Sequence, residues 1–418
     1  MRQLRTLTQL VEHLDQVIKL LEYHEAVDVA YLDFAKAYDK VDFGLLLQRL
    51  EEVGIQGKVQ AWIAAFLKGR KQRVKVNGVI GKVSEVVSGI PQGTILGPLL
   101  FILYIAPLSQ LPHHCQISSY ADDTKLTIGR DGSDSNPLQR DLDTIYSWVE
   151  HHNMAFNASK FMVMTYGESD SPAVYLDSAQ RPISQVSSTR DLGVILQSNG
   201  KFDQHIQEKV SKASQLCGWI FRTFKTRDKL SMLTLYKSLI LPHLDYCSLV
   251  WSPSSVGDLQ RIESVQRLLT RNIEGMRHLS YWDRLKRLNL HSVERRFERY
   301  KIIFVFKCLH DLVPNPGISF NSNPRTGIYC HIIVPPRGQK KCVRSLQSSF
   351  VLNRAPTLYN CLPKDLRVMF NDETNPLDKF KTALDDYLKK IPDQPTVSGL
   401  SRPSNSNSIP DQKYYMLT

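Results

Sequence analysis

Three aspartates carry the residue type and the spacing that metal-dependent chemistry needs. Asp122 and Asp123 stand side by side in QISSYADDTKLTIG, whose flanks predict a hairpin of two strands. Adjacent carboxylates on a tight turn repel each other and bury little apolar surface, so they do little for folding. Asp33 follows a predicted buried strand in AYLDFAKAYDKVD. If the strand ends meet in one sheet, the carboxylates can hold two Mg²⁺ ions ~3.5–4 Å apart, as nucleotidyl transfer requires.

Either motif alone has a simpler explanation. Asp33 could cap the end of its strand, and the Asp pair could occupy an ordinary turn. The segment SGIPQGTILGPLLFILYI, between the two motifs, supports the chemical interpretation, because a Pro-Gln-Gly turn leading into an apolar helix can place backbone close to a ligand.

The chain of 418 residues is basic, with a formal net charge of +12, and 42% of its residues are hydrophobic. Residues 201–300 hold 18 Lys and Arg against 10 Asp and Glu. We interpret this stretch as a track for nucleic acid, with a solvated helical surface as the alternative. A basic run, KGRKQRVK at 68–75, overlaps a predicted strand and is not interpreted as a nuclear signal. The longest apolar run, 99–106, is too short to span a membrane.

Hydrophobic periodicity and turn residues predict the order of elements. Helices are expected at 4–23, 43–53, 58–68, 98–108 and 138–151, and a buried strand at 27–34. Asp42 should cap the helix that begins at residue 43, and Asn77-Gly78 should form a hairpin turn. Short strands are expected over 157–196. Residues 202–312 are expected to be almost wholly helical, with Trp219, Phe221, Tyr236, Trp251 and Trp282 in the core.

The catalytic segments resemble the reverse transcriptase of non-LTR (LINE-type, Jockey-like) retrotransposons. YLDFAKAYDKVD at 31–42, SGIPQGTILGPLLFILYI at 88–105 and YADD at 120–123 match three blocks of that family in order and spacing. NASKFMVM at 157–164 is similar to its lysine-bearing block, and RDLGVIL at 190–196 to its primer-grip block. Weaker similarity continues to about residue 390.

The resemblance implies an α+β fold. A palm, made of an antiparallel sheet backed by helices and carrying incomplete fingers, would span 1–198, and a basic helical thumb 199–312. A linker and a small C-terminal helical module would follow over 313–391, and a disordered tail over 392–418.

The resemblance also implies which residues form the catalytic site. Asp33, Asp122 and Asp123 would be the catalytic carboxylates and the metal ligands, with the backbone carbonyl of Phe34 as an added ligand. Lys160 would supply a proton or a positive charge to the departing pyrophosphate.

Three further residues would bind the nucleotide. Tyr38 stands where the family usually has Phe, and its ring would pack under the sugar and exclude a 2′-hydroxyl. Gln92 would contact the incoming nucleotide or the template, and Gly93 would allow close backbone approach. The implied cofactors are two Mg²⁺ ions. The implied partners are an RNA template, a DNA primer and deoxynucleoside triphosphates, with no membrane and no defined protein partner.

One part of the family pattern is missing. Only 32 residues precede Asp33, and none of them resembles the fingers blocks that clamp the triphosphate. We therefore expect a copy truncated at the N-terminus. Three functions stay open: an RNA-directed DNA polymerase, a catalytically impaired remnant that only binds nucleic acid, and a decayed reading frame with no selected function.

Overall fold

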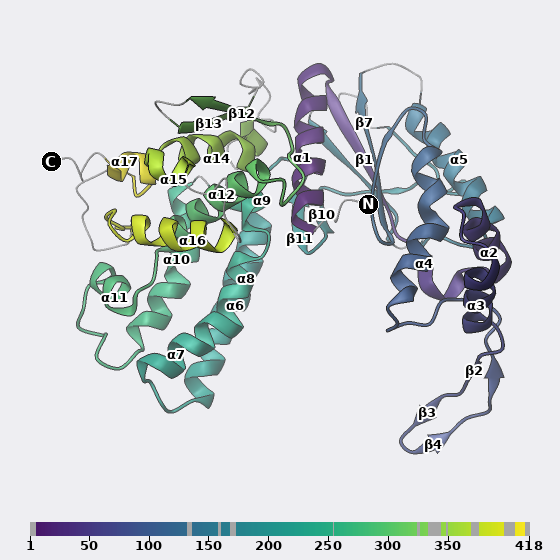
Figure 1. Ribbon diagram of the computed structural model, residues 1–418, viewed down its shortest axis with the longest axis horizontal. Coiled ribbons are helices and arrows are strands. Elements are labelled where there is room, and N and C mark those ends of the chain that lie inside the picture. The colour runs from purple at the N-terminus through teal and green to yellow at the C-terminus, as the bar shows by residue number, and fades with distance from the viewer. Residues whose placement is uncertain are drawn as a thin grey trace. The chain divides into compact units, whose positions relative to one another are not determined.

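The computed structural model divides the chain into two compact units (Figure 1). The sheet unit comprises residues 23–187, and the helical unit comprises residues 1–22 together with 188–418. The structure describes residues 6–131, 136–157, 160–167, 173–253, 255–323, 327–332, 344–347, 350–368, 376–396 and 406–413. The division differs from the expected boundary at residue 198, because the first helix and residues 188–198 group with the helical unit.

The sheet unit is built on a five-stranded sheet with the order β6-β7-β1-β8-β9. Its strands are β1 (Ala26–Leu32), β6 (Gln116–Tyr120), β7 (Asp123–Arg130), β8 (Met162–Gly167) and β9 (Ser184–Gln185). β1 pairs antiparallel with β7 on one edge and with β8 on the other, and the β8–β9 pair is parallel. The sequence of β1, AVDVAYL, is almost continuously apolar, as a central strand requires, and all seven residues are buried.

Helices lie on one side of β1 and β7 (Figure 1). They are α2 (Phe43–Glu52), α3 (Gly57–Leu67), α4 (Leu96–Ile105) and α5 (Pro137–His151), with short 3₁₀ turns η1 (Ala37–Lys40) and η2 (Ala106–Gln110). A single hydrophobic cluster includes Leu32 from β1, Leu46 from α2, Phe101 from α4 and Leu142 from α5. The predicted α+β fold with a mainly antiparallel sheet is confirmed.

Local predictions hold where side chain and backbone act over a few residues. Asp42 caps α2, and its Oδ1 accepts hydrogen bonds from the backbone N–H of Gly44 (2.8 Å) and Leu45 (3.0 Å). Asn77 and Gly78 form the turn of a hairpin, both with positive φ (49° and 86°). The hairpin comprises β2 (Lys71–Gln72), β3 (Lys75–Val76), β4 (Val79–Ile80) and β5 (Ser84–Glu85).

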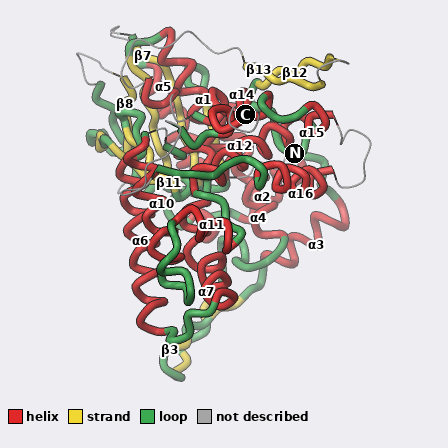
Figure 2. The backbone as a smooth tube through the Cα atoms, turned by 90° about the vertical axis from the view of Figure 1, so that its left-hand side faces the viewer, coloured by secondary structure: helices red, strands yellow, loops and turns green. Residues whose placement is uncertain are grey.

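In the part of the helical unit that the structure describes, two small hairpins accompany what is otherwise mostly helix (Figure 2). The hairpins are β10 (Ser188–Asp191) with β11 (Val194–Gln197), and β12 (Ile318–Asn323) with β13 (Gly327–Ile332). The helices are α1 (Thr6–Tyr23), α6 (Asp203–Thr223), α7 (Lys229–Leu235), α8 (Leu241–Asp245), α9 (Ser248–Trp251), α10 (Val256–Arg271), α11 (Tyr281–Leu288), α12 (Val293–Leu309), α14 (Val351–Asn360), α15 (Lys364–Val368), α16 (Pro376–Leu388) and α17 (Ile409–Lys413), with a π-helical stretch, η3 (Tyr236–Ile240).

Three expectations for this unit need correction. Trp219 is 44% exposed rather than in the core, although Tyr236 and Trp251 are fully buried. The expected linker contains the β12–β13 hairpin. Part of the expected disordered tail is ordered, because Asn407 is buried and donates a hydrogen bond to Asp393 (2.9 Å). Residues 397–405 and 414–418 lie outside the described residues.

None of the helices that the structure describes is long and apolar enough to cross a membrane.

A buried acid ties the three central strands together. Asp28 of β1 is fully buried and forms an ion pair with Arg130 of β7 (2.8 Å). It also accepts hydrogen bonds from Thr165 of β8 (2.6 Å) and from the Tyr175 hydroxyl (2.5 Å). One buried carboxylate therefore connects the side chains of both strands that flank β1, Arg130 of β7 and Thr165 of β8.

Replacing Asp28 should destabilise the sheet unit strongly. Asp28→Asn leaves Arg130 without its counter-charge in a largely buried place, which typically costs ~3–5 kcal/mol. Urea denaturation of the full chain, followed by circular dichroism, measures the change. Asp143→Asn, on the exposed face of α5, is the matched control. Equal stability of the two variants would contradict this account of the sheet.

Candidate active site

Strand register brings the three predicted carboxylates to one end of the sheet. The last β1–β7 pair is Leu32 with Thr124, so the next residues along the two strands are Asp33 and Asp123. Tyr120 pairs with Asp123 and closes a two-residue turn of Ala121 and Asp122. All three carboxylates thus stand at adjacent strand ends, although residues 33 and 123 are far apart in sequence.

The hairpin turn adopts an unfavourable backbone conformation. Ala121 has φ of 55°, a left-handed conformation that residues with a Cβ seldom adopt. A two-residue hairpin normally places Gly, Asn or Asp at such a position. Backbone strain of this kind costs ~1–3 kcal/mol and tends to occur at functional sites.

Lys160 is the fourth charged group of the site. Its Nζ lies 3.1 Å from Asp33 Oδ2. The backbone holds it there: the N–H of Asn157 donates to the carbonyl of Asp33 (2.8 Å), and the N–H of Lys160 donates to the carbonyl of Asn157 (2.9 Å). The hydrogen bond and the charge of Asp33 raise the pKa of Lys160, and Asp123 and Asp122 add to this effect. The ammonium therefore senses all three carboxylates.

Phe34 fixes the strand extension that carries Asp33. It forms an antiparallel bridge with Phe156, and the two rings stack with their centroids 4.8 Å apart. The hydrogen bonds of this bridge join Ala35 to Ala155 and Asn157 to Asp33, so the bridge does not use the carbonyl of Phe34. In an antiparallel pair such a carbonyl points away from the partner strand, here toward the side of the β6–β7 hairpin.

Tyr38 lies on η1, next to the carboxylates. Its ring stacks on Phe101 of α4, with a centroid distance of 4.7 Å. Burial raises the pKa of Tyr38, and the negative charge of Asp122 raises it further. The ring is therefore held in place from one side by the core and lies within electrostatic range of the hairpin turn.

The Pro-Gln-Gly segment contacts η1, the short 3₁₀ turn that carries Tyr38. The N–H of Ile90 donates to the carbonyl of Tyr38 (2.8 Å), and Gln92 Nε2 donates to Asp39 Oδ1 (3.2 Å). Gly93 has φ of 78°, which a residue with a side chain adopts only with strain, and a Cβ added there would meet no atom within 4 Å. Gln92 and Gly93 are exposed. The structure thus brings all the predicted residues into the sheet unit.

The structure tests how well the site would suit a divalent metal. Carboxylate oxygens are the donors that Mg²⁺ prefers, and the site already attracts one cation, the Lys160 ammonium. As they stand, no three His, Cys, Asp or Glu side chains among the described residues are close enough together to hold a metal ion. The donor type fits a metal, and the side chains would have to rearrange to bind it.

Sequence reasoning missed Asp141, which holds the loop before β6. Its carboxylate accepts hydrogen bonds from the backbone N–H of His113 (3.0 Å), His114 (2.9 Å) and Cys115 (2.7 Å). A signal was present, since Asp141 is an acid among Leu138, Leu142 and other residues of the apolar face of α5, where a carboxylate needs a partner. By fixing residue 115, Asp141 sets the start of the strand that leads to the carboxylate turn.

The basic stretch 201–300 is only partly a surface. Arg284, Arg295 and Arg296 are buried, and Arg296 is paired with Asp245 at 2.9 Å. These three cations lie in the interior of the helical unit and are not available to a polyanion. Part of the charge excess that suggested a nucleic-acid track is therefore buried and does not contribute to a surface track.

Asp141 should make stability depend on acid pH. Burial acts to raise the pKa of Asp141, but the three backbone donors outweigh it and hold the pKa below the ordinary value of 3.8. The contribution of the carboxylate is therefore complete above pH 3.8 and is lost as the pH falls through the lower, folded-state pKa. We expect Asp141→Asn to lower the free energy of unfolding by ~1–3 kcal/mol at neutral pH, and the difference to shrink below pH 3.8. Urea denaturation at several pH values measures both effects, and a difference that stays constant with pH would contradict this assignment.

Comparisons with known proteins find similarity to reverse transcriptases. Residues 2–196 match the family described as reverse transcriptase (RNA-dependent DNA polymerase). The chain is 26% identical over 289 residues to a probable RNA-directed DNA polymerase from transposon X-element of Drosophila melanogaster, covering 65% of this chain and 31% of that protein. It is 27% identical over 277 residues to the RNA-directed DNA polymerase from mobile element jockey of Drosophila funebris, covering 62% of this chain and 29% of that protein.

The chain spans about three tenths of the length of these curated relatives. A solved telomerase from Candida Tropicalis, in complex with a fragment of telomeric RNA, covers 90% of this chain and 52% of its own at 12% identity, with a TM-score of 0.38, too distant a likeness to carry an argument. The matched region contains Asp33, the Pro-Gln-Gly turn, the carboxylate hairpin and Lys160. Residues 2–196 are thus similar to reverse transcriptases, and the curated relatives are RNA-directed DNA polymerases of mobile elements.

Proposed function

We propose that this chain is an RNA-directed DNA polymerase that adds deoxynucleotides to a primer 3′-hydroxyl by two-metal nucleotidyl transfer. The observation that carries the proposal is the convergence of Asp33, Asp122 and Asp123 at adjacent strand ends, with Lys160 beside them. The partners would be an RNA template, a DNA primer and deoxynucleoside triphosphates.

The carboxylates would hold two Mg²⁺ ions, with the Phe34 carbonyl as a further ligand. When bound, the ions would lower the pKa of the attacking 3′-hydroxyl and stabilise the charge on the departing pyrophosphate. Asp33 would first have to release Lys160, which now forms an ion pair with it. Electrostatics would favour this exchange, because a doubly charged ion interacts more strongly with the carboxylates than an exposed ammonium does.

The released ammonium of Lys160 would then face the phosphates. Its pKa is raised, so it is protonated at neutral pH and can donate a hydrogen bond or a proton to the pyrophosphate oxygen as the bond to the α-phosphorus breaks. Before the substrate binds, the Lys160 ammonium would offset the negative charge of the carboxylates. After the metal ions bind, it would offset the negative charge of the leaving group.

Tyr38 and the Pro-Gln-Gly turn would select and position the nucleotide. The Tyr38 ring is held against Phe101, so it cannot easily move aside for a 2′-hydroxyl. Gln92 would exchange its bond to Asp39 for the nucleotide or the template, and the open space at Gly93 would accept backbone contact with a phosphate or a sugar.

A second function is a catalytically impaired protein that only binds nucleic acid. The observation that favours it is the absence, among the described residues, of a ready-made group of three metal-binding side chains. Catalysis of phosphoryl transfer depends on positioning and charge neutralisation, so a site that cannot assemble its ligands would be slow.

Primer extension separates the two functions. The full chain is incubated with a poly(rA)/oligo(dT) substrate, Mg²⁺ and dTTP, alongside Asp122→Ala, Asp123→Ala. We expect extension by the wild type and a loss of at least ~10³-fold in the double variant, because the metal ligands are gone. Asp203→Ala, Asp386→Ala removes the same charge from exposed sites of the helical unit and should keep full activity.

The wild type and the double variant should bind the substrate similarly. Binding by both with extension by neither would favour the second function. Equal extension by both would exclude the proposed catalytic site.

A further inference from the structure

The hairpin over residues 68–87 has a feature that the proposed catalytic site does not explain. It contains six Lys or Arg residues against a single acid, Glu85. This is a much denser positive charge than that of the helical stretch 201–300. Every residue of the hairpin, 68–87, is exposed except Arg70 and Val86. Figure 1 shows β2, β3 and β4 extending beyond α2 and α3, away from the body of the sheet unit.

Five of the six cations of the hairpin have no partner among the described residues, and Arg70 is the exception. No hydrogen bond or ion pair joins the side chains of Lys68, Lys71, Arg73, Lys75 or Lys82 to any residue that the structure describes. This sets them apart from Arg284, Arg295 and Arg296, which are buried in the helical unit. Exposed cations without partners keep their full charge for an external anion.

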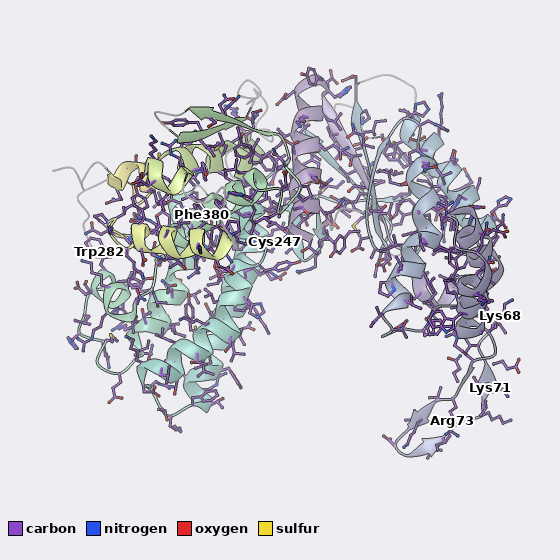
Figure 3. All side chains as sticks on the ribbon, in the orientation of Figure 1. Lys68, Lys71, Arg73, Cys247, Trp282 and Phe380 are labelled. Carbon is purple, nitrogen blue, oxygen red and sulfur yellow. The ribbon has the colours of Figure 1, made fainter. Side chains whose placement is uncertain are left out.

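The two faces of the hairpin differ in chemistry. In β3 and β4 Lys75 pairs with Ile80 and Val76 pairs with Val79, so the two valines share one face and Lys75 lies on the other. Lys71, Arg73 and Lys75 stand at alternate positions of the arm that contains β2 and β3, with Val74 and Val76 among the residues between and beside them. Lys71 of β2 pairs with Glu85 of β5, so the acid shares the face of Lys71. Figure 3 shows Lys68, Lys71 and Arg73 following one another down one arm of the hairpin.

The basic row of Lys71, Arg73 and Lys75 is long enough to meet more than one phosphate. Residues two apart on a strand are ~6.6 Å from each other. One strand of a duplex carries a phosphate for every ~3.4 Å of helix axis. A row of three cations can therefore face several phosphates of one strand.

The base of the hairpin is fixed next to the candidate active site. Arg70 donates hydrogen bonds to the carbonyl of Leu67 (2.7 Å) and to that of Gly89, three residues before Gln92. The N–H of Val86 donates back to the carbonyl of Arg70 (2.9 Å). The two ends of the hairpin are thus clamped together, and one of them continues directly into the Pro-Gln-Gly turn.

We propose that the basic row of this hairpin, formed by Lys71, Arg73 and Lys75, binds the sugar-phosphate backbone of a nucleic-acid duplex that the site works on. The proposal rests on the proposed function for the identity of the substrate, and it adds the surface that holds the duplex. It concerns the basic row only. Its contribution is electrostatic, independent of base sequence and sensitive to salt.

Salt dependence of binding tests the proposal without catalysis. Fluorescence anisotropy measures the affinity of the full chain for a labelled DNA duplex between ~50 and ~200 mM salt. Each phosphate contact that is lost makes the slope of log K against log salt shallower by ~0.9. Lys71→Ala, Arg73→Ala, Lys75→Ala should therefore bind more weakly and show a slope shallower by ~2.7.

The matched control is Lys379→Ala, Lys389→Ala, Lys390→Ala, which removes three exposed lysines from the helical unit and should keep the wild-type slope. Arg73→Glu, a single change on an exposed residue, should reduce the affinity in the same direction if the triple variant proves unstable. Circular dichroism confirms that each variant is folded.

An unchanged slope and affinity in both hairpin variants would overturn the proposal. So would an unchanged slope together with an altered sedimentation coefficient, which would make the hairpin a protein-docking surface. If the wild type extends no primer but the hairpin triple variant still shows the predicted shallower salt slope, only the proposed function is refuted.

Discussion

The main constraint on the sheet unit is that it must hold three carboxylates at adjacent strand ends against the repulsion between their like charges. Like charges repel each other, and the repulsion is stronger near a protein surface than in water because the effective dielectric constant is lower there. Asp33, Asp122 and Asp123 nevertheless stand at adjacent strand ends. The fold must hold them there, and it does so with β1, which is buried throughout and hydrogen-bonded on both edges.

The surrounding residues divide this task. Asp28 joins β1 to β7 and β8 below the site, and Asp141 fixes the chain just before β6. Lys160 supplies the positive charge that offsets the repulsion while no other cation is present. A cluster of this kind is poorly adapted for stability but well adapted to attract a divalent ion, and the ion in turn neutralises a polyphosphate. The basic row of the hairpin would add attraction for the rest of the nucleic-acid backbone.

Sequence alone predicted the features that depend on neighbouring residues. The Asp42 cap, the Asn77-Gly78 turn and the carboxylate hairpin each involve contacts over two to four positions, and their residue types have few other uses. The helix boundaries of the sheet unit were predicted to within a few residues for the same reason. The set of candidate site residues also came from sequence, by resemblance, and the structure gathers them in one unit.

The remaining features depend on contacts between distant residues, which periodicity does not encode. Trp219 has the type of a core residue but lies on an exposed part of α6. The segment around Asn407 has a composition typical of disorder, yet Ser292, Asp393 and Glu298 supply it with hydrogen-bond partners. The burial of Arg295 and Arg296 likewise could not be deduced from a count of charges. The division into units at residue 187 reflects contacts of α1 and of 188–198 within the helical unit, which no local signal marks.

Metal binding by the carboxylates is the most direct test of the central claim, that Asp33 acts together with Asp122 and Asp123. Mn²⁺, which has the same preference for oxygen ligands as Mg²⁺, can be titrated into the full chain and followed by the electron paramagnetic resonance of the free ion. We expect Asp33→Asn to weaken binding by ~10-fold or more, and Lys160→Met, which removes the competing ammonium, to bind at least as tightly as the wild type. Asp203→Asn, an exposed acid of the helical unit, should behave like the wild type. If Asp33→Asn binds Mn²⁺ as tightly as Asp203→Asn does, the three carboxylates do not form one metal site.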